Sequence, residues 1–449
     1  MLLIIILTFI AVLVIIKTAK IEFITRVVLY CFVGYWFVSL IISCINPYDF
    51  YPIKAVTYVL LLLGVVSFVV GMLVRKNRIM PNNGHLLGCD IPLVERVIDK
   101  MVTNKIVISV FLIVSIYCIP MVINTVVLAA ISGGVAMTDD KMEVVFLNSA
   151  FNSLLFQYVM YPLLHLDYAL IAFSIVKRKF NILSWIAFLV YLIEFMLMAG
   201  GRSILFVALI YIIIIYICTN TKETIKQLNI KRLLAFSILL AIVFYGVSVM
   251  NSYRTEGILI GGERDSDKSP FEEVTERIVT YSTLPFALFN DALEKGTYDR
   301  FQYTYGRATF AGVDVLVNGL MKRIGIPYKT TMDIVIDVQE NYIQVGPDSY
   351  YNYAYTGLLY HYIDFGVFGI FFFPFIFGFA FRKIIIYFYK KPRASGLLLI
   401  GVSFFLALHS IFTCYFIKPW VLPYIIILLF LYHIKGNNRR GRLGLNANV

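Results

Sequence analysis

Three arginines, Arg202, Arg254 and Arg307, border apolar stretches or lie late in a long polar segment of this chain. The guanidinium group suits an anionic ligand because it can donate two parallel hydrogen bonds to one phosphate. His361 and Asp364 follow further along, and either side chain can accept a proton from an attacking hydroxyl. Cations for a leaving phosphate together with a base for a nucleophile predict group transfer from a phosphate-linked donor. A solitary arginine in water is, however, commonly only a solvated charge.

The elements that must position these residues are long apolar stretches. The chain is 60% hydrophobic, and backbone within a bilayer can leave the helical form only where protein or water covers it. A helix needs about 20 apolar residues to cross, so the sequence predicts an all-α polytopic integral membrane protein with about 11 transmembrane helices. The expected spans are 2–16, 23–44, 55–74, 106–130, 150–176, 182–198, 203–219, 233–249, 354–381, 395–415 and 419–434.

The distribution of positive charge predicts the orientation. The formal net charge is +12, and Lys and Arg gather in alternate connections, among them 75–78, 177–179 and 382–393. Connections rich in Lys and Arg stay on the cytoplasmic side. We therefore expect the N-terminus outside and the C-terminus inside. Because topology explains the excess of positive charge, a nucleic-acid partner is not expected.

The domain organisation follows from these spans. Residues 1–250 are expected to hold the first eight spans with a cytoplasmic connection at 75–105, in which 91–101 has the pattern of an interfacial helix. Residues 251–351 form one large extracytoplasmic loop. Residues 352–434 are expected to hold a re-entrant or half-helix segment and the last three spans, and 435–449 a basic cytoplasmic tail.

The large outer loop has expected structure of its own. Ser269-Pro270-Phe271-Glu272 reads as a capping box with proline at the first helical position, which predicts a helix start. A second short helix is expected over 309–321. The loop is rich in tyrosine, whose flat ring can cover a sugar face, although tyrosine is also common at membrane interfaces. The side chains that we expect to bind sugar are Tyr303, Tyr305, Asn352 and Tyr353.

Ionisable groups within the spans are costly and usually face a bundle interior or a wet cavity. His165 and Asp167 share the fifth span. Glu194 and Arg202 flank a very short connection after Gly200, and they are close enough in sequence to pair across it. Such an ion pair would either stabilise the hairpin or take part in binding a ligand.

The segment 352–381 is too long for one untilted span. Phe365 to Phe381 alone would rise about 25 Å as a helix, so a break at Asp364-Phe365-Gly366 is expected. The half-helix before it would then lie in the outer leaflet, with His361 and Asp364 at a cavity mouth. The alternative is one continuous tilted helix.

Neither a metal site nor a disulfide framework is expected. The six cysteines show no CxxC pair, and none lies in the 251–351 loop. Asp265 and Asp267 form the one Asp-x-Asp pair near the outer face. We interpret this pair as part of a solvated turn and not as a metal site.

Three motifs in this order resemble the Wzy-type O-antigen and capsular repeat-unit polymerases. They are Gly200-Gly201-Arg202-Ser203 at the start of a span, Gly306-Arg307 late in the outer loop, and Asn352-Tyr-Ala-Tyr-Thr-Gly followed by Asp364-Phe-Gly-Val-Phe-Gly369. The resemblance covers about 200–380 by motif and the whole chain by topology.

The resemblance implies a metal-independent glycosyltransferase without a cofactor, in the bacterial cytoplasmic membrane. Such enzymes transfer a growing glycan from undecaprenyl diphosphate to the next lipid-linked repeat unit, to make O-antigen or capsular polysaccharide. Donor, acceptor, a chain-length regulator and a flippase are the implied partners.

In that reaction, fixed cations would stabilise the departing diphosphate, and the candidates are Arg202, Arg254, Arg307 and Arg323. The candidate bases are His361, Asp364 and Glu194. Rival hypotheses are an O-antigen ligase, a GT-C-type glycosyltransferase and, from another class, a flippase for the lipid-linked unit.

Overall fold

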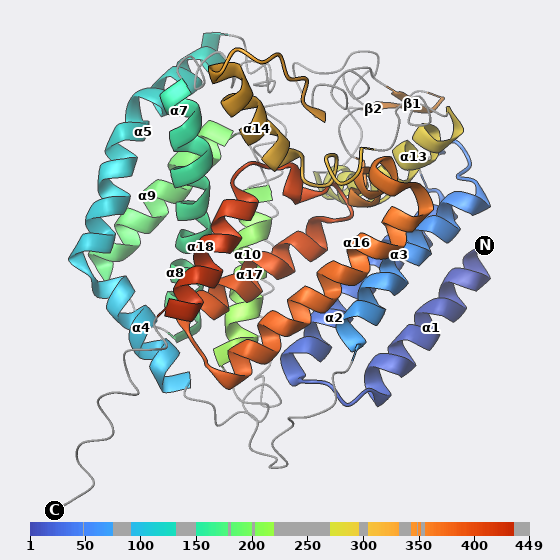
Figure 1. Cartoon of the computed structure of the whole chain (residues 1–449), viewed down its shortest axis with the longest axis horizontal. Coiled ribbons are helices and arrows are strands. Elements are labelled where there is room, and N and C mark those ends of the chain that lie inside the picture. Colours follow the sequence, from blue (N-terminus) through green and yellow to red (C-terminus); the bar gives the residue numbers. More distant parts are fainter. Residues whose placement is uncertain are drawn as a thin grey trace, which may run out of the picture.

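The computed structural model describes residues 1–47, 49–74, 91–131, 150–177, 181–199, 203–219, 270–295, 304–331, 343–347, 349–351 and 355–434, and these are mostly helical (Figure 1). The described residues also include two strands, one short π-helical segment and one 3-10 turn. The elements are α1 (Leu2–Thr18), α2 (Phe23–Ile45), α3 (Ala55–Leu73), α4 (Ile91–Thr103), α5 (Lys105–Ile131), α7 (Ala150–Leu155), the π-helical η1 (Phe156–Met160), α8 (Tyr161–Lys177), α9 (Ile182–Ala199), α10 (Ser203–Thr219), α13 (Pro270–Glu294), α14 (Ala311–Arg323), β1 (Ile343–Gly346), β2 (Ser349–Tyr351), α16 (Gly357–Lys390), α17 (Ala394–His409), the 3-10 turn η2 (Tyr415–Ile417) and α18 (Val421–Ile434).

Helices occupy all the predicted spans that fall on described residues, and the predicted span 233–249 lies outside them. Five described helical segments are long and apolar enough to cross a membrane: Phe23–Ile45, Ala55–Leu73, Lys105–Ile123, Phe156–Lys177 and Gly357–Lys390. The other apolar helical segments have 10 to 17 residues when only residues with described side chains are counted. The helical membrane character is thus supported, while the count of eleven spans and their orientation stay predictions.

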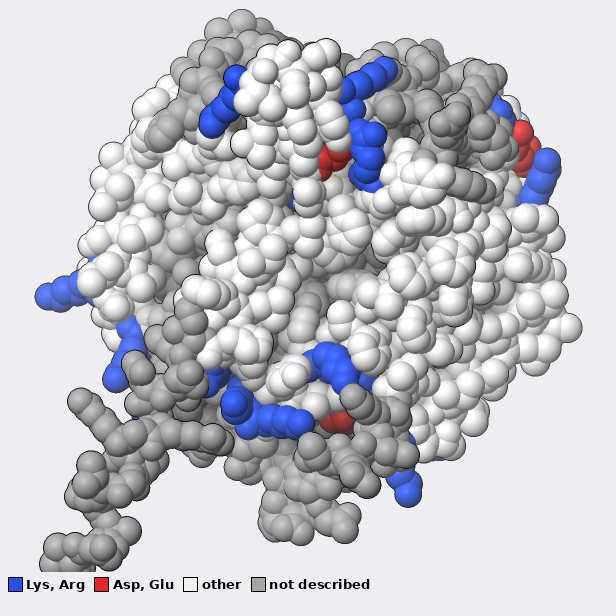
Figure 2. Space-filling view, in the orientation of Figure 1, with Lys and Arg blue, Asp and Glu red and all other residues white. Residues whose placement is uncertain are grey.

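Charged side chains lie mainly at two opposite margins of the face in Figure 2. A broad band between these margins is nearly free of Lys, Arg, Asp and Glu among the described residues. Exposed apolar side chains such as Ile113, Ile193 and Phe368, each more than half exposed, lie on the surfaces of α5, α9 and α16. An apolar surface of this extent is unfavourable in water but suits the hydrocarbon of a bilayer.

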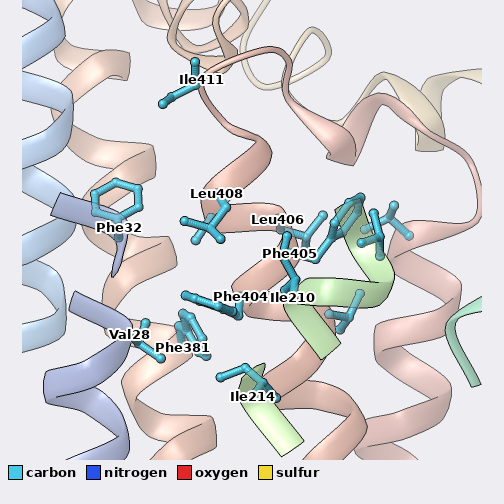
Figure 3. Packing of buried hydrophobic residues seen from close by; sticks show 14 of the residues in the cluster. Val28, Phe32, Ile210, Ile214, Phe381, Phe404, Phe405, Leu406, Leu408 and Ile411 are labelled. Atoms are coloured by element: carbon cyan, nitrogen blue, oxygen red, sulfur yellow. The ribbon is translucent and has the colours of Figure 1, made fainter. Parts of the chain in front are cut away.

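The core is centred on α17, in which every residue from Leu399 to His409 is buried. A helix that is apolar all round is buried in a protein core or in a membrane. Figure 3 shows Phe404 and Leu408 of α17 between Val28 of α2 and Ile210 of α10. This central helix joins the first helices of the chain to the middle ones.

Glycines bring α3 and α16 into close contact. A Cβ atom at Gly71 would lie 2.1 Å from the carbonyl oxygen of Phe375, and one at Gly378 would lie 2.3 Å from that of Phe68. Small residues let helices in a membrane approach closely and gain van der Waals contact. These glycines therefore fix the position of α16, which carries His361 and Asp364.

The loop elements lie over one end of this bundle (Figure 1). Helix α13 begins at Pro270, as predicted, and α14 lies close to the expected 309–321. The Oδ1 atom of Asn290 in α13 accepts hydrogen bonds from the backbone N–H of Lys54, at 2.9 Å, and from Thr57 Oγ1, at 2.7 Å. The antiparallel pair β1–β2, in which Ile343 is opposite Tyr351, was not predicted.

Helix α4 confirms the helix predicted over 91–101. Its Glu95 forms an ion pair with Lys177 at the end of α8, with the Oε1 and Nζ atoms 2.6 Å apart. Ser184 Oγ of α9 donates to the carbonyl oxygen of Val102. These contacts tie α4 to α8 and α9, and its place at the inner membrane interface stays a prediction.

Candidate functional site

The predicted break in the segment 352–381 is present. Within α16, Phe365 has φ −146° and ψ 20°, and Gly366 has φ 61° and ψ −143°, so the helix is interrupted at these two residues. A positive φ with that ψ is nearly confined to glycine, since a Cβ would clash with the backbone. The sequence Asp364-Phe365-Gly366 therefore ends a short first helix, Gly357–Asp364, before the longer second one begins.

The carboxylate of Asp364 binds a turn that lies about 60 residues earlier in the chain. Oδ1 accepts hydrogen bonds from Thr304 Oγ1, at 2.6 Å, and from the Ala308 N–H, at 2.9 Å. Oδ2 accepts one from the Thr309 N–H at 2.8 Å. Asp364 is fully buried, and burial of an ionised carboxylate is tolerable only when donors surround it. Two motifs that are separate in the sequence, Gly306-Arg307 and Asp364-Phe-Gly, thus form one structure.

Glycines make this arrangement sterically possible. In the turn 304–310, Tyr305 and Gly306 have φ values of 50° and 94°, so the backbone turns sharply there. A Cβ at Gly369 would lie 1.9 Å from the carbonyl oxygen of His361. The last glycine of Asp364-Phe-Gly-Val-Phe-Gly369 is therefore required because the second part of α16 passes directly beside the first.

His361 lies one turn before Asp364 and is half-buried. Its Nδ1 atom is 2.9 Å from Thr309 Oγ1, and its ring stacks on Phe373 with the centroids 5.0 Å apart. The Thr309 backbone N–H binds Asp364 at the same time. Thr309 therefore links both candidate bases to the turn, and the ring of His361 is held from two sides.

An apolar cavity of about 190 Å³ adjoins this histidine. Phe32 of α2, Phe68 of α3 and Phe377 of α16 contribute to its walls, and His361 and Thr309 supply polar groups. Most of the other residues that line it are also apolar. The cavity therefore suits a hydrocarbon group next to a polar reacting centre.

Arg307 is held by a carboxylate on α14. Its Nε and Nη2 atoms donate to Oδ1 and Oδ2 of Asp314, each at 3.2 Å, and Nη2 also donates to the carbonyl oxygen of Lys329 at 3.0 Å. The guanidinium lies 5.2 Å from the ring centroid of Tyr328. Its side chain is 44% exposed, whereas that of Asp314 is 4% exposed.

Asp314 is ionised in this cluster. Burial acts to raise the pKa of this carboxyl, but hydrogen bonds from Arg307, Tyr328 and Thr331 outweigh it, so the pKa lies below its ordinary value. A guanidinium has five N–H donors, and three are in use. The hydrogen bonds to Asp314 and Lys329 do not use Nη1, and Tyr328 also interacts with the guanidinium.

Other candidates do not join this cluster. Arg323 is exposed at the far end of α14, and the rise along the helix separates it from the Arg307 end by about 18 Å. Glu194 on α9 lies beside Cys118 of α5, and its Oε2 has no hydrogen-bond partner among the described residues. Tyr305 is 75% exposed and packs edge-on against Phe365.

The remaining sequence candidates lie outside the described residues. These are Arg202, Arg254, Tyr303, Asn352 and Tyr353. The expected pairing of Glu194 with Arg202 and the expected diphosphate contacts of Arg202 and Arg254 therefore stay predictions.

His165 and Asp167 belong to a second buried cluster, on α8. His165 Nδ1 is 2.9 Å from Tyr211 Oη of α10, and its ring lies 4.6 Å from that of Trp420. Both carboxylate oxygens of Asp167 are buried without a hydrogen-bond partner among the described residues. No described contact connects this cluster with His361.

Sequence reasoning missed Thr309, Asp314 and Tyr328. Asp314 follows Arg307 by seven residues, but Arg307 lies in the turn before α14, so this spacing gave no helical signal. Thr309 gave no signal either. In the described ranges, His, Cys, Asp and Glu do not gather in groups of three or more that could hold a metal ion.

Comparison of the chain with protein families, curated proteins and solved structures found no match.

Proposed function

We propose that this chain is a membrane glycosyltransferase that polymerises lipid-linked oligosaccharide repeat units. The observation that carries the proposal is the junction at Asp364, which joins the turn that contains Arg307 to the helix that carries His361, and His361 lines an apolar cavity. A cation, a base and a hydrocarbon-lined cavity are what a glycosyl donor with a lipid diphosphate leaving group requires.

In the proposed reaction, a hydroxyl oxygen of the acceptor sugar attacks the anomeric carbon of the donor. The bond between that carbon and the phosphate oxygen breaks, and the diphosphate leaves with the electron pair. The hydroxyl proton passes to Nε2 of His361. This requires the tautomer in which Nδ1–H donates to Thr309 Oγ1, and that bond together with the Phe373 ring holds the imidazole in one orientation.

Arginine would stabilise the negative charge that develops on the diphosphate. The described hydrogen bonds of Arg307 to Asp314 and Lys329 leave Nη1 unused, and the bidentate bond to Asp314 fixes the plane of the guanidinium. Arg202 and Arg254 are proposed to complete the anion site. Asp364 is proposed to position the turn, since all three of its described hydrogen bonds go to residues 304–309.

We further propose that the chain resides in a bacterial cytoplasmic membrane with its N-terminus outside and its C-terminus inside. The support for this orientation is the gathering of Lys and Arg in alternate connections between the predicted spans. The reaction would then take place on the outer face, under the 251–351 loop, with the apolar cavity receiving isoprenyl units next to His361.

The first test is the glycan profile of cells that lack the gene. Loss of long polymer with single repeat units still displayed supports the proposal. Units trapped inside the cell would mean a flippase, and full-length polymer retained on its lipid carrier would mean a ligase.

Complementation separates the site from the fold. His361→Ala should fail to restore polymer at normal protein level. His433→Ala is the matched control, because His433 lies exposed near the end of α18 and contacts its own helix through the Leu429 carbonyl; it should restore polymer fully. Equal activity of the two variants would contradict the role of His361.

A further inference from the structure

A second cavity, of about 320 Å³, lies between the end of α1 and the neighbouring helices α3 and α16. Its apolar walls come from Ile15, Ile21 and Leu73, and its basic groups are Lys20 and Arg382. Arg382 lies 16 residues beyond the break at Gly366, about 24 Å along the helix. The cavity is therefore at the opposite end of α16 from the candidate site.

Arg382 is built into the wall of this cavity. Its side chain is 6% exposed, its Nε lies 3.5 Å from Glu22 Oε2, and its Nη1 donates to the carbonyl oxygen of Val74 at 3.2 Å. Glu22 Oε2 also accepts a hydrogen bond from Thr25 Oγ1 at 3.0 Å. The guanidinium is thus oriented by the carboxylate at the start of α2, and its Nη2 has no hydrogen-bond partner among the described residues.

Two further cations accompany Arg382. Lys20 is exposed at the rim and has no ion pair among the described residues. Arg26 Nη2 donates at 3.1 Å to the carbonyl oxygen of Ala19, which lines the cavity. The Nε atom of Arg26 is buried and has no hydrogen-bond partner among the described residues. Two cations therefore line the cavity and a third contacts one of its lining residues, whereas no carboxylate lines it among the described residues, so its electrostatic potential favours an anion.

The apolar walls and the cations together indicate a ligand with both an apolar part and an anionic group. A free phosphate would satisfy the cations but leave the apolar walls in contact with water, and a neutral lipid would leave the cations without a partner. Because α3 and α16 are both of membrane-spanning length and composition, a lipid can reach the cavity from the bilayer.

We propose that this cavity binds an anionic phospholipid, with its phosphate against Lys20 and Arg382 and an acyl chain along Ile15 and Ile21. The lipid would fill the space between α1 and α16 and thereby hold α1 against the bundle. Figure 1 shows α1 at the edge of the molecule, and Ile5, Val12 and Ile16 are its buried residues. This site is independent of the proposed glycosyl transfer.

The test uses the full chain, purified in detergent and stripped of lipid. Its thermal midpoint is measured with increasing phosphatidylglycerol, phosphatidylcholine or inorganic phosphate. Phosphatidylglycerol should raise the midpoint in a saturable manner, whereas phosphatidylcholine and phosphate should not. Lys20→Gln should require about fivefold more phosphatidylglycerol for half of the shift, as expected for loss of one lysine near an anionic surface.

Lys54→Gln is the matched control, since Lys54 is an exposed lysine at the other end of α3, and it should leave the titration unchanged. Lys20 is exposed, so its replacement does not require refolding of the core as a change at Arg382 would. An equal shift with phosphatidylcholine, an equal shift with phosphate alone, or an unchanged titration in Lys20→Gln would each overturn the proposal.

Discussion

Replacement of Asp364 by asparagine tests how the 304–310 turn is held. The carboxylate accepts from three donors through two oxygens, whereas an asparagine amide has one oxygen. In the better orientation that oxygen keeps Thr304 Oγ1 and the Ala308 N–H, and the amide nitrogen then faces the Thr309 N–H. One charge-assisted bond is lost and one buried donor is left without an acceptor, which costs about 1–3 kcal/mol.

Hydrogen–deuterium exchange of the purified full chain measures this cost. If the turn opens locally, exchange at the amides of Ala308 and Thr309 should be about 5- to 150-fold faster in Asp364→Asn than in the wild type. Asp364→Ala, which loses all three bonds, should show a larger effect at the same amides. Amides in the middle of α17 should be unaffected, because no described hydrogen bond links that helix to Asp364 or to its three donors.

Asp291→Asn is the control. Asp291 Oδ1 pairs with Lys295 at 2.8 Å on the surface of α13, and the lysine side chain is 59% exposed, so its loss should cost well under about 1 kcal/mol. If the exchange of Ala308 and Thr309 in Asp364→Asn matched that of the control, the carboxylate would not be what holds the turn. If the turn opened but polymer length was unchanged, the turn would not belong to the site of glycosyl transfer.

Other contacts give further predictions. Gly71→Leu should lower the thermal midpoint by overpacking the α3–α16 contact, at a cost of about 1–3 kcal/mol, whereas Gly34→Leu, with open space around its Cβ position, should not. Arg307→Lys should expose 307–331 to protease because an ammonium cannot replace the guanidinium fork, and the exposed Arg323→Lys should leave the digestion pattern unchanged. Since the pKa of Asp314 is lowered in the folded chain, its stabilisation is complete above the ordinary value of 3.8 and is lost as the pH falls through the lowered pKa. Protease sensitivity of 307–331 that rose already between pH 8 and pH 5 would contradict this assignment.

Several features could be predicted from the sequence because their causes are local. Runs of apolar residues predicted the helices, and proline after serine predicted the start of α13 at Pro270. The glycine in Asp364-Phe365-Gly366 predicted the break in α16, since only glycine readily adopts the backbone conformation found there. Composition alone indicated a helical membrane protein, because a bilayer leaves so few alternatives for the backbone.

Only the tertiary structure brought Asp364 to Ala308 and Thr309, across 56 and 55 residues of chain. No local pattern encodes such a contact, because a buried carboxylate can be satisfied by donors from any part of the chain. The same holds for Gly71 and Gly378, whose small size has meaning only once α3 and α16 are in contact. The sequence thus determined which segments are helical and where one breaks, and packing decided which polar groups meet, because these pairings depend on distances between helices that are remote in the chain.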